Sequence, residues 1–218
     1  MQWADSLART APSLDRKVLN LATRAMTCAL QHGDMQIDPT RLSVIDYSRP
    51  STEQRLWVFD LGQQRLLFRE WVAHGRNSGE NMALQFSNRT GSYMSSLGGF
   101  TTQETYMGGN GYSLRLQGLE PGFNDNARDR AIVIHGASYV SPDFAQTQGR
   151  LGRSLGCPAV RSEVAHALID AIQGGTFVFA YYPDNDWLRH SQLLNCTGGN
   201  GRLAATRQAD ADDGQGGI

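Results

Sequence analysis

The sequence lacks an excess of either charge, and it lacks a long apolar run. Of its 218 residues, 20 are Lys or Arg and 21 are Asp or Glu, which gives a formal net charge of −1 at pH 7. This balance provides no basic surface for nucleic acid and no polybasic patch for an anionic membrane. No apolar run reaches the roughly 20 residues of a membrane-spanning helix. We therefore expect no nucleic-acid partner and no membrane-spanning segment.

Cysteine is also scarce, because the chain contains only Cys28, Cys157 and Cys196. An odd number of cysteines at long separations argues against a disulfide framework, and no two of them have the spacing of metal ligands. Cys28 lies within a helical pattern and is expected to be a small buried core residue. Cys196 lies in a glycine-rich tail, where we expect it to be incidental. Cys157 is therefore the cysteine that we consider as a candidate functional residue.

The first ten residues lack the marks of a secretory signal, since they have neither a basic start nor an apolar h-region. If Met1 is the true start, this predicts a cytoplasmic protein. If translation starts upstream of Met1, a periplasmic or cell-envelope protein is expected instead. The in-frame codons before Met1 distinguish the two.

Glycine, in contrast, is abundant, and the 24 glycines predict many loops and turns. Apolar residues at helical spacing predict a helix over residues 14–30, opened by Pro12-Ser13 and closed near Gly33. Patterns typical of β-strands follow at residues 42–47, 55–60, 65–72, 112–116, 131–135 and 176–182.

Two further helices are expected between the last two of these strands. Ser141-Pro142 begins the first, with an N-cap residue followed by a proline at the first helical position. Ser162 caps the second, and Gly174-Gly175 ends it. Residues 75–111 are rich in Gly, Ser, Asn and Thr, and we expect long loops between short strands there. The sum is a mainly β fold with a few helices.

The chemistry-bearing feature is a cysteine among glycines and arginines, with a histidine upstream. Cys157 follows Gly156, and His135 ends an apolar strand just before Gly136. The thiolate is the reactive form of cysteine, and a nearby base or positive charge favours it. A histidine at a strand end is rigidly supported, as a general base should be. The alternative is a histidine held by local hydrogen bonds, and taken alone the pair is a weak signal.

The chain on either side of Cys157 suggests how a substrate is held. Flexible backbone at this point can turn the N–H groups of Leu155, Gly156 and Cys157 toward one point, where they would stabilise an oxyanion. Three arginines are candidates to lower the thiol pKa or to hold a substrate carboxylate: Arg150, Arg153 and Arg161. For each of these arginines the alternative is a solvated loop surface.

These motifs resemble the L,D-transpeptidase (YkuD-like) family, and within it the murein L,D-transpeptidase catalytic-domain subfamily. The resemblance covers about residues 15–184. It is carried by Ile134-His135-Gly136 and by Gly152–Val160. Further similar segments are residues 45–52, 72–75, 86–88, 95–98 and 180–184.

The resemblance implies a β-sandwich-like catalytic domain, which we place at residues 36–184. An N-terminal segment and helix occupy residues 1–35. Residues 185–218 lose all periodicity, and we expect a disordered tail.

The resemblance also implies a cysteine acyltransferase that acts on peptidoglycan stem peptides or muropeptides, without metal or cofactor. Cys157 would attack the bond between the diamino acid and D-alanine, His135 would act as base, and the backbone of residues 155–157 would form the oxyanion hole. An amine would then take the acyl group to give a crosslink, or water would take it to give trimming.

Two positions depart from the wider family. Leu155 stands where the family has a histidine, and Ala159 stands where it has an arginine. The residue that orients the substrate is therefore open, with Arg153 the first choice. The expected substrate-binding residues are Arg153, Ser154, Gly136, His74, Ser96 and Arg161.

Three alternatives remain. One is a cytoplasmic L,D-carboxypeptidase of muropeptide recycling, which uses water as acceptor. Another is a non-catalytic peptidoglycan-binding module, which the presence of Cys157, His135 and Gly156 disfavours. The third is a zinc site of Cys157, His135 and His74, although the spacing of these residues along the chain is not that of typical zinc ligands.

Overall fold

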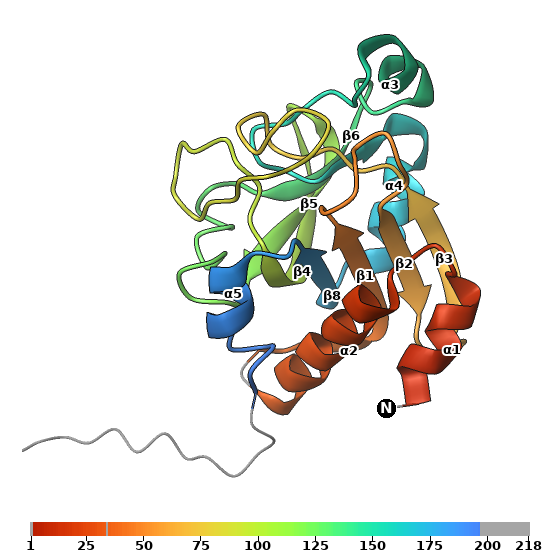
Figure 1. The fold of residues 1–218 in the computed structure, drawn as a ribbon, viewed down its shortest axis with the longest axis vertical. Helices are drawn as coiled ribbons and strands as arrows, with labels where there is room; N and C mark the ends of the chain where they lie inside the picture. Colours follow the sequence, from red (N-terminus) through yellow and green to blue (C-terminus); the bar gives the residue numbers. More distant parts are fainter. Residues whose placement is uncertain (1, 34, 197–218) are drawn as a thin grey trace, which may run out of the picture.

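The computed structural model describes residues 2–33 and 35–196 (Figure 1). Among them, the helices are α1 (Gln2–Thr10), α2 (Arg16–Gln31), α3 (Pro142–Gln148), α4 (Ser162–Ile172) and α5 (Asn185–His190). The strands are β1 (Asp38–Asp46), β2 (Leu56–Asp60), β3 (Arg65–Glu70), β4 (Gly98–Gly108), β5 (Gly111–Gly118), β6 (Val133–Ala137), β7 (Ala159–Arg161) and β8 (Thr176–Tyr181). The mainly β fold with a few helices is as expected.

The described strands form one sheet in the order β3-β2-β1-β8-β4-β5-β6-β7. The pairs β1–β8 and β6–β7 are parallel, and the other neighbours are antiparallel. Just past β3, the Ala73 N–H donates to the carbonyl of Ala159 in β7 at 2.8 Å. This bridge joins the two ends of the sheet. The sandwich-like domain is therefore a single sheet that curls into a nearly closed barrel.

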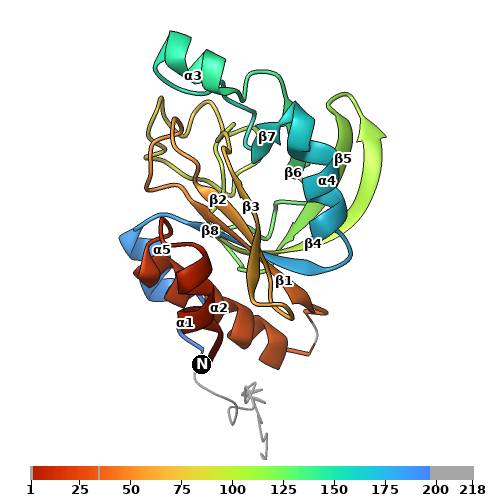
Figure 2. The same ribbon diagram turned by 90° about the vertical axis from the view of Figure 1, so that its right-hand side faces the viewer.

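Helix α2 covers one face of the sheet and builds much of the core (Figure 2). Its N-cap Asp15 accepts a hydrogen bond from the Lys17 N–H at 2.6 Å, as helix starts require. The helix buries an apolar face against β1 and β8: Val18, Leu19, Ala22, Ala25, Met26 and Ala29. Each large apolar side chain buried in this way contributes about 1.5–3 kcal/mol. The helix predicted over residues 14–30 is confirmed.

Several elements differ from the sequence-based expectation. The long strand β4 lies within the segment 75–111, for which loops between short strands were expected. Its glycines, threonines and polar residues give no alternating pattern, and its register against β5 shifts between Thr102 and Thr105. The short strand β7 and helix α1 were not predicted. Hydrogen bonds to neighbouring strands, which are not visible locally, decide β4 and β7.

The expectation of a disordered tail from residue 185 is wrong as far as residue 196. Asp184 caps helix α5, and Trp187 is fully buried against Phe179, with ring centroids 5.7 Å apart. The Trp187 indole N–H donates to the Glu120 carboxyl group at 3.3 Å. Residues 197–218, the remainder of that expected tail, lie outside the described residues.

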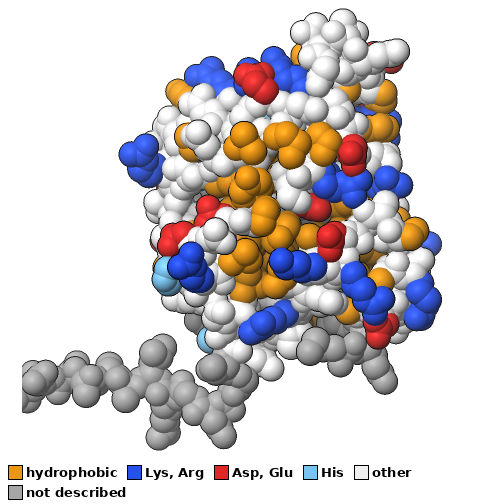
Figure 3. Space-filling view, in the orientation of Figure 1, with side chains coloured by type: hydrophobic (Ala, Val, Ile, Leu, Met, Phe, Trp, Pro, Cys, Tyr) orange, Lys and Arg blue, Asp and Glu red, His pale blue; other side chains and the backbone are white. Residues whose placement is uncertain are grey.

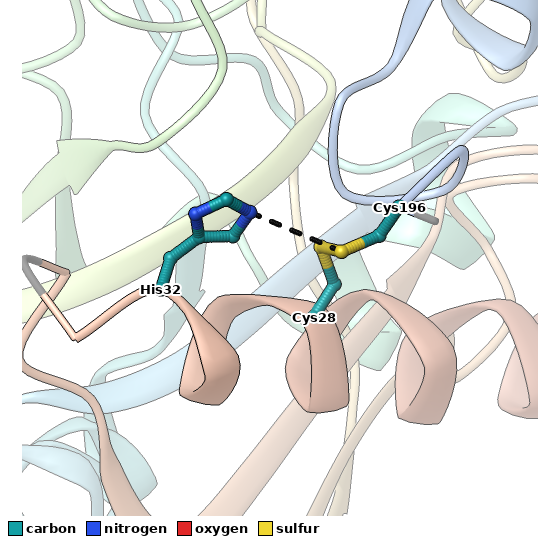
Figure 4. A group of neighbouring side chains, drawn as sticks. All are labelled: Cys28, His32 and Cys196. Atoms are coloured by element: carbon teal, nitrogen blue, oxygen red, sulfur yellow. Dashed lines mark hydrogen bonds between the residues drawn. A yellow bond between two sulfur atoms is a disulfide. The ribbon is translucent and has the colours of Figure 1, made fainter. Parts of the chain in front are cut away.

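Cys28 and Cys196 form a disulfide, which corrects the expectation that Cys196 is incidental (Figure 4). Cys28 is buried in the core, as expected, and in addition carries this bond. Their Cα atoms lie 5.9 Å apart across a sequence separation of 168 residues. The His32 ring lies beside the bond, with Nε2 3.9 Å from the Cys196 sulfur. The odd number of cysteines is explained by one pair and one free thiol, Cys157.

The surface mixes both charges, as the composition predicts. On the face of Figure 1, basic and acidic side chains are interspersed around a band of apolar ones (Figure 3). No helix of the described chain has the length and apolar character needed to cross a bilayer.

Candidate active site

Cys157 and His135 lie on neighbouring segments near the seam where the curled sheet closes. In the parallel pair β6–β7, His135 lies opposite Ala159, and Cys157 precedes Ala159 by two residues. The Cys157 sulfur accepts a hydrogen bond from the Val133 N–H at 3.4 Å and donates to the Ala131 carbonyl at 3.6 Å. Cys157 is therefore adjacent to the strand that carries His135, on the same edge of the sheet.

The tautomer of His135 follows from one hydrogen bond. Its Nδ1 lies 2.9 Å from the Gly136 carbonyl, which can only accept. Nδ1 therefore carries the proton, and the basic lone pair is on Nε2. Burial lowers the pKa of His135, so the ring is neutral at pH 7. A backbone carbonyl thus orients this histidine without an acidic partner.

Gly136 also allows helix α4 to pack close to β6. A Cβ atom on this residue would lie 2.9 Å from the Ala165 side chain of α4. Gly136, which the sequence offered as a substrate contact, therefore has two roles that concern His135 and α4. It holds the imidazole through its carbonyl, and it lets the helix approach the strand.

The thiol of Cys157 is held in its protonated form. Burial raises its pKa, while the hydrogen bond from the Val133 N–H and the positive charge of Arg130 lower it. The net direction is upward from an ordinary value of 9.0, so the resting group at pH 7 is a thiol. At pH 7 the two residues are therefore an undissociated thiol and a neutral imidazole.

The loop before Cys157 is held by one hydroxyl. Ser154 Oγ accepts from the Gly156 N–H at 3.1 Å and donates to the Cys157 carbonyl at 2.6 Å. Gly156 adopts a φ of +126°, and a Cβ atom there would lie 2.8 Å from the Met94 carbonyl oxygen. Within the described residues, the N–H groups of Leu155 and Cys157 donate to no acceptor. Of the three expected oxyanion donors, these two are unengaged, and the Gly156 N–H is held by Ser154.

The arginines expected near the thiol are paired with carboxylates instead. Glu80 accepts from Arg150 at 2.8 Å and from Arg153 at 2.6 Å. Arg161 makes a bidentate pair with Glu70, at 2.6 and 2.9 Å. None of these three arginines is among the groups that lower the Cys157 pKa. Whether Arg153 or Arg161 binds a substrate carboxylate stays a prediction.

His74 is an internal residue, with 1% of its surface exposed. The Arg55 guanidinium, which has no acceptor atom, donates to Nδ1 at 2.7 Å, so the proton is on Nε2, 3.3 Å from the Gly79 carbonyl. Burial and the charge of Arg55 lower the pKa of His74 to about 3. Its carbonyl accepts from the Ser154 N–H at 3.0 Å. This burial argues against the expected substrate contact, because His74 supports the nucleophile loop from inside.

Ser96 is internal as well, with 4% of its surface exposed. Its hydroxyl donates to the Ser87 carbonyl at 2.9 Å and accepts from Arg130 at 2.5 Å. The neighbouring Ser95 hydroxyl donates to the Gly156 carbonyl at 3.1 Å and accepts from the Gly75 N–H at 3.0 Å. Both serine side chains are therefore buried and make internal hydrogen bonds next to the site rather than face the solvent.

Arg130 is a site residue that sequence reasoning missed, because it stands in an ordinary charged stretch outside any motif. Ser95 lies in the segment 95–98, which resembles the family, but its hydrogen bond to the Gly156 carbonyl was not expected. Only the folding of the segment 87–96 against the Cys157 loop brings both residues to this loop.

One group of potential ligand atoms within 4.8 Å of one another stands out in the described part of the chain: Cys28, His32 and Cys196. The two sulfur atoms are joined in a disulfide and so are not thiolate ligands. Cys157, His135 and His74 form no such group among the described residues.

Comparison with known proteins gives a consistent result. A family model described as "L,D-transpeptidase catalytic domain" matches residues 10–181. No curated protein sequence matches the chain.

Several solved structures are similar to this chain at low sequence identity. An L,D-transpeptidase from Mycobacterium smegmatis is 14% identical, with a TM-score of 0.42 over 66% of this chain and 59% of that one. An L,D-transpeptidase from Xylanimonas cellulosilytica is 19% identical, with a TM-score of 0.38 over 71% and 68%. The helical cell shape determining protein of Campylobacter jejuni is 13% identical, with a TM-score of 0.43 over 74% and 57%. The chain spans about three fifths of the length of the first and third of these proteins.

Proposed function

Because the chain belongs to the L,D-transpeptidase catalytic-domain family, we propose that it is a cysteine acyltransferase of peptidoglycan stem peptides. The observation that carries the proposal is the placement of Cys157 beside β6, the strand on which His135 has its Nε2 lone pair free. A cysteine thiol and an oriented neutral imidazole on neighbouring segments are the groups that nucleophilic acyl transfer requires.

The proposed first half-reaction releases D-alanine. His135 Nε2 takes the proton of the Cys157 thiol as the sulfur attacks the carbonyl carbon of the diamino acid–D-Ala bond. The N–H groups of Leu155 and Cys157 are unengaged donors that would stabilise the oxyanion. The protonated imidazole then gives its proton to the departing amine, the C–N bond breaks, and a thioester remains on Cys157.

The second half-reaction is the reverse, with a new acceptor. An amine or a water molecule loses a proton to His135 Nε2, attacks the thioester carbonyl, and displaces the Cys157 sulfur, which regains its proton. An amine acceptor gives a crosslink or an anchored protein, and water gives L,D-carboxypeptidase trimming. The same residues serve both outcomes.

We also propose that the protein works outside the cytoplasm. The disulfide between Cys28 and Cys196 supports this, because such bonds persist in oxidising compartments and are rare in the reducing cytoplasm. Polymerised peptidoglycan lies in the same location. This favours the exported form of the enzyme over a cytoplasmic carboxypeptidase of muropeptide recycling.

The test is to incubate the protein with a disaccharide tetrapeptide, with and without an added acceptor peptide, and to identify products by mass spectrometry. Wild type should release D-alanine, and the product mass reports whether an amine or water took the acyl group. Cys157→Ala should give no product, and His135→Gln should be slower by about 10²–10⁴-fold, because the base is lost. The exposed variant Arg128→Gln is the matched control and should behave as wild type. Equal turnover by wild type and Cys157→Ala would contradict the proposal.

A further inference from the structure

Among the described residues, Arg130 is the cation whose charge lowers the pKa of the Cys157 thiol, and neither the family motif nor the proposed reaction assigns it a role. It lies half-buried in the turn that precedes β6, and the next residue is Ala131, whose carbonyl accepts from the thiol at 3.6 Å. The backbone next to Arg130 therefore contacts the Cys157 thiol.

The guanidinium is fixed by four hydrogen bonds to one segment. Nη1 donates to the Ser87 carbonyl at 2.6 Å and to Ser96 Oγ at 2.5 Å. Nη2 donates to Ser92 Oγ at 3.2 Å and to the Met94 carbonyl at 2.6 Å. All the N–H bonds of the two terminal nitrogens are thereby used. Arg130 consequently ties residues 87–96 to the start of β6.

The same guanidinium packs against the nucleophile loop. A Cβ atom on Gly156 would lie 3.4 Å from Arg130 Nη2 and 2.8 Å from the Met94 carbonyl oxygen that Nη2 binds. Glycine at this position lets the loop approach both groups. The positive charge thus lies against the residue that immediately precedes Cys157.

In the described part of the chain, no carboxylate pairs with the Arg130 guanidinium. Within the described residues, Arg130 donates only to carbonyl and hydroxyl oxygens and takes part in no ion pair, whereas Arg150, Arg153 and Arg161 each pair with a glutamate. Because all of these acceptors are neutral, the Arg130 guanidinium keeps its full positive charge, which acts on the groups around it. An opposite charge within about 4–6 Å shifts a thiol or carboxyl pKa downward by about 1–3 units.

We propose that Arg130 is a positioning residue with a second, electrostatic role: it holds residues 87–96 against the Cys157 loop and stabilises the Cys157 thiolate as His135 removes the proton. The proposal rests on Cys157 being the nucleophile. The other titratable groups near the sulfur are His135 on β6, Tyr139 in the following loop and Tyr47 at the end of β1. All three are neutral at pH 7, so the stabilising charge comes from Arg130.

The direct test is the pH dependence of alkylation of Cys157 by iodoacetamide in the intact chain. Because Cys28 and Cys196 are joined, the unreduced protein has one free thiol, and the label reports Cys157 alone. Arg130→Gln should move the midpoint of the rate profile upward by about 1 pH unit, because the charge that favours the thiolate is lost. Arg130→Lys should keep the midpoint near that of wild type. Arg128→Gln, an exposed arginine two residues away, is the control and should shift nothing.

A second pair of variants keeps Arg130 in place, so that the test survives if Arg130→Gln does not fold. Ser92 contributes the Oγ atom at 3.2 Å from Nη2. Ser92→Asp puts a carboxylate against the guanidinium and should raise the midpoint, whereas the neutral Ser92→Asn should not. If Ser92→Asp and folded Arg130→Gln both titrate as wild type, or if Arg130→Lys shifts as far as Arg130→Gln, the electrostatic role is wrong.

Alkylation of Cys157 needs no substrate. Failure of the electrostatic role of Arg130 can therefore be distinguished from failure of the proposed function. A shifted midpoint in Arg130→Gln with no turnover of muropeptides by wild type would overturn the function and leave the electrostatic assignment standing. Turnover that depends on Cys157, together with an unshifted midpoint in Arg130→Gln, would support the proposed function and overturn the electrostatic role of Arg130. In the turnover assay we expect Arg130→Gln to lower kcat more than it raises KM, because the thiolate forms during the reaction and not on binding.

Discussion

At the residue scale, the environment of Cys157 favours the protonated thiol. Burial raises the pKa of Cys157 and lowers that of His135, so the resting pair is a thiol and a neutral imidazole. A thiol is oxidised less readily than a thiolate. This protects Cys157 in a protein that also carries a disulfide. The positive charge of Arg130 opposes the effect of burial and lowers the pKa of Cys157; in the proposed reaction this would favour the thiolate.

The buried His74 gives a pH-dependent stability. Its pKa in the folded protein is about 3, well below the ordinary 6.5, because of burial and the charges of Arg55 and Arg153. The remaining titratable group nearby is Tyr47, whose ring lies 6.5 Å away. Between these pKa values the unfolded chain binds one more proton than the folded one. Stability is therefore complete above pH 6.5 and falls as pH drops toward 3.

We expect the free energy of unfolding to drop by up to about 1.4 kcal/mol per pH unit in this window through His74 alone. His74→Gln, which retains an acceptor for Arg55, should remove that part of the slope. Urea denaturation of both proteins at pH 7, 6, 5 and 4 measures the difference. Parallel loss of stability in the two proteins would show that His74 is not held neutral.

At the scale of elements, the C-terminal part of the described chain is tied to the N-terminal helix. The disulfide joins Cys196 to Cys28 of α2, and α5 buries Trp187 against β8. The tether closes a loop of 168 residues and so includes the whole curled sheet. A bond of this span constrains the unfolded chain more than the folded one.

Removal of the tether should destabilise the protein without touching the site. Cys28→Ser or Cys196→Ser is expected to lower the free energy of unfolding by about 2–4 kcal/mol. Cys157→Ser, which removes the free thiol and leaves the disulfide, is the matched control and should unfold near the wild-type midpoint. Thermal unfolding without reductant compares them. If both kinds of variant melt together, the disulfide carries no stability.

Elements with local signals were predictable, and elements made by pairing were not. Helices α2 and α3 and strands β1, β2, β3, β5, β6 and β8 have caps, turns or apolar patterns that the sequence displays. Strand β4 is rich in Gly and Thr, and β7 has three residues, so their hydrogen-bond partners define them. Helix α5 lies in a stretch without periodicity, and Trp187 is its one buried residue.

At the scale of the whole molecule, the candidate site lies where the sheet closes on itself. Ala73 bridges to Ala159, and Gly75 bridges to Ser154, so the chain beyond β3 lies against the Cys157 loop. The Arg76 N–H donates to the Ser154 carbonyl at 2.8 Å and strengthens this seam. The position of the nucleophile is therefore a consequence of barrel closure and not of its own loop alone.

The number of free thiols in the native protein tests the proposed compartment. Protein taken from its native location, denatured without reductant and treated with iodoacetamide should carry a single label, on Cys157, because the other cysteines are joined. Treatment after reduction should add labels at Cys28 and Cys196. Peptide mass spectrometry counts them. Labels on all the cysteines before reduction would overturn the proposed location outside the cytoplasm.

Local patterns alone were enough to indicate a strand-rich fold, the family, and Cys157 and His135 as the residues proposed to react, because motif spacing and alternation are written along the chain. The fold decided which arginine acts on the thiol, since Arg153 meets Glu80 while Arg130 meets only neutral oxygens. It also decided the pairing of Cys28 with Cys196 and the burial of His74. These depend on distances between segments remote in sequence, and strand order and sheet closure set such distances with no local trace.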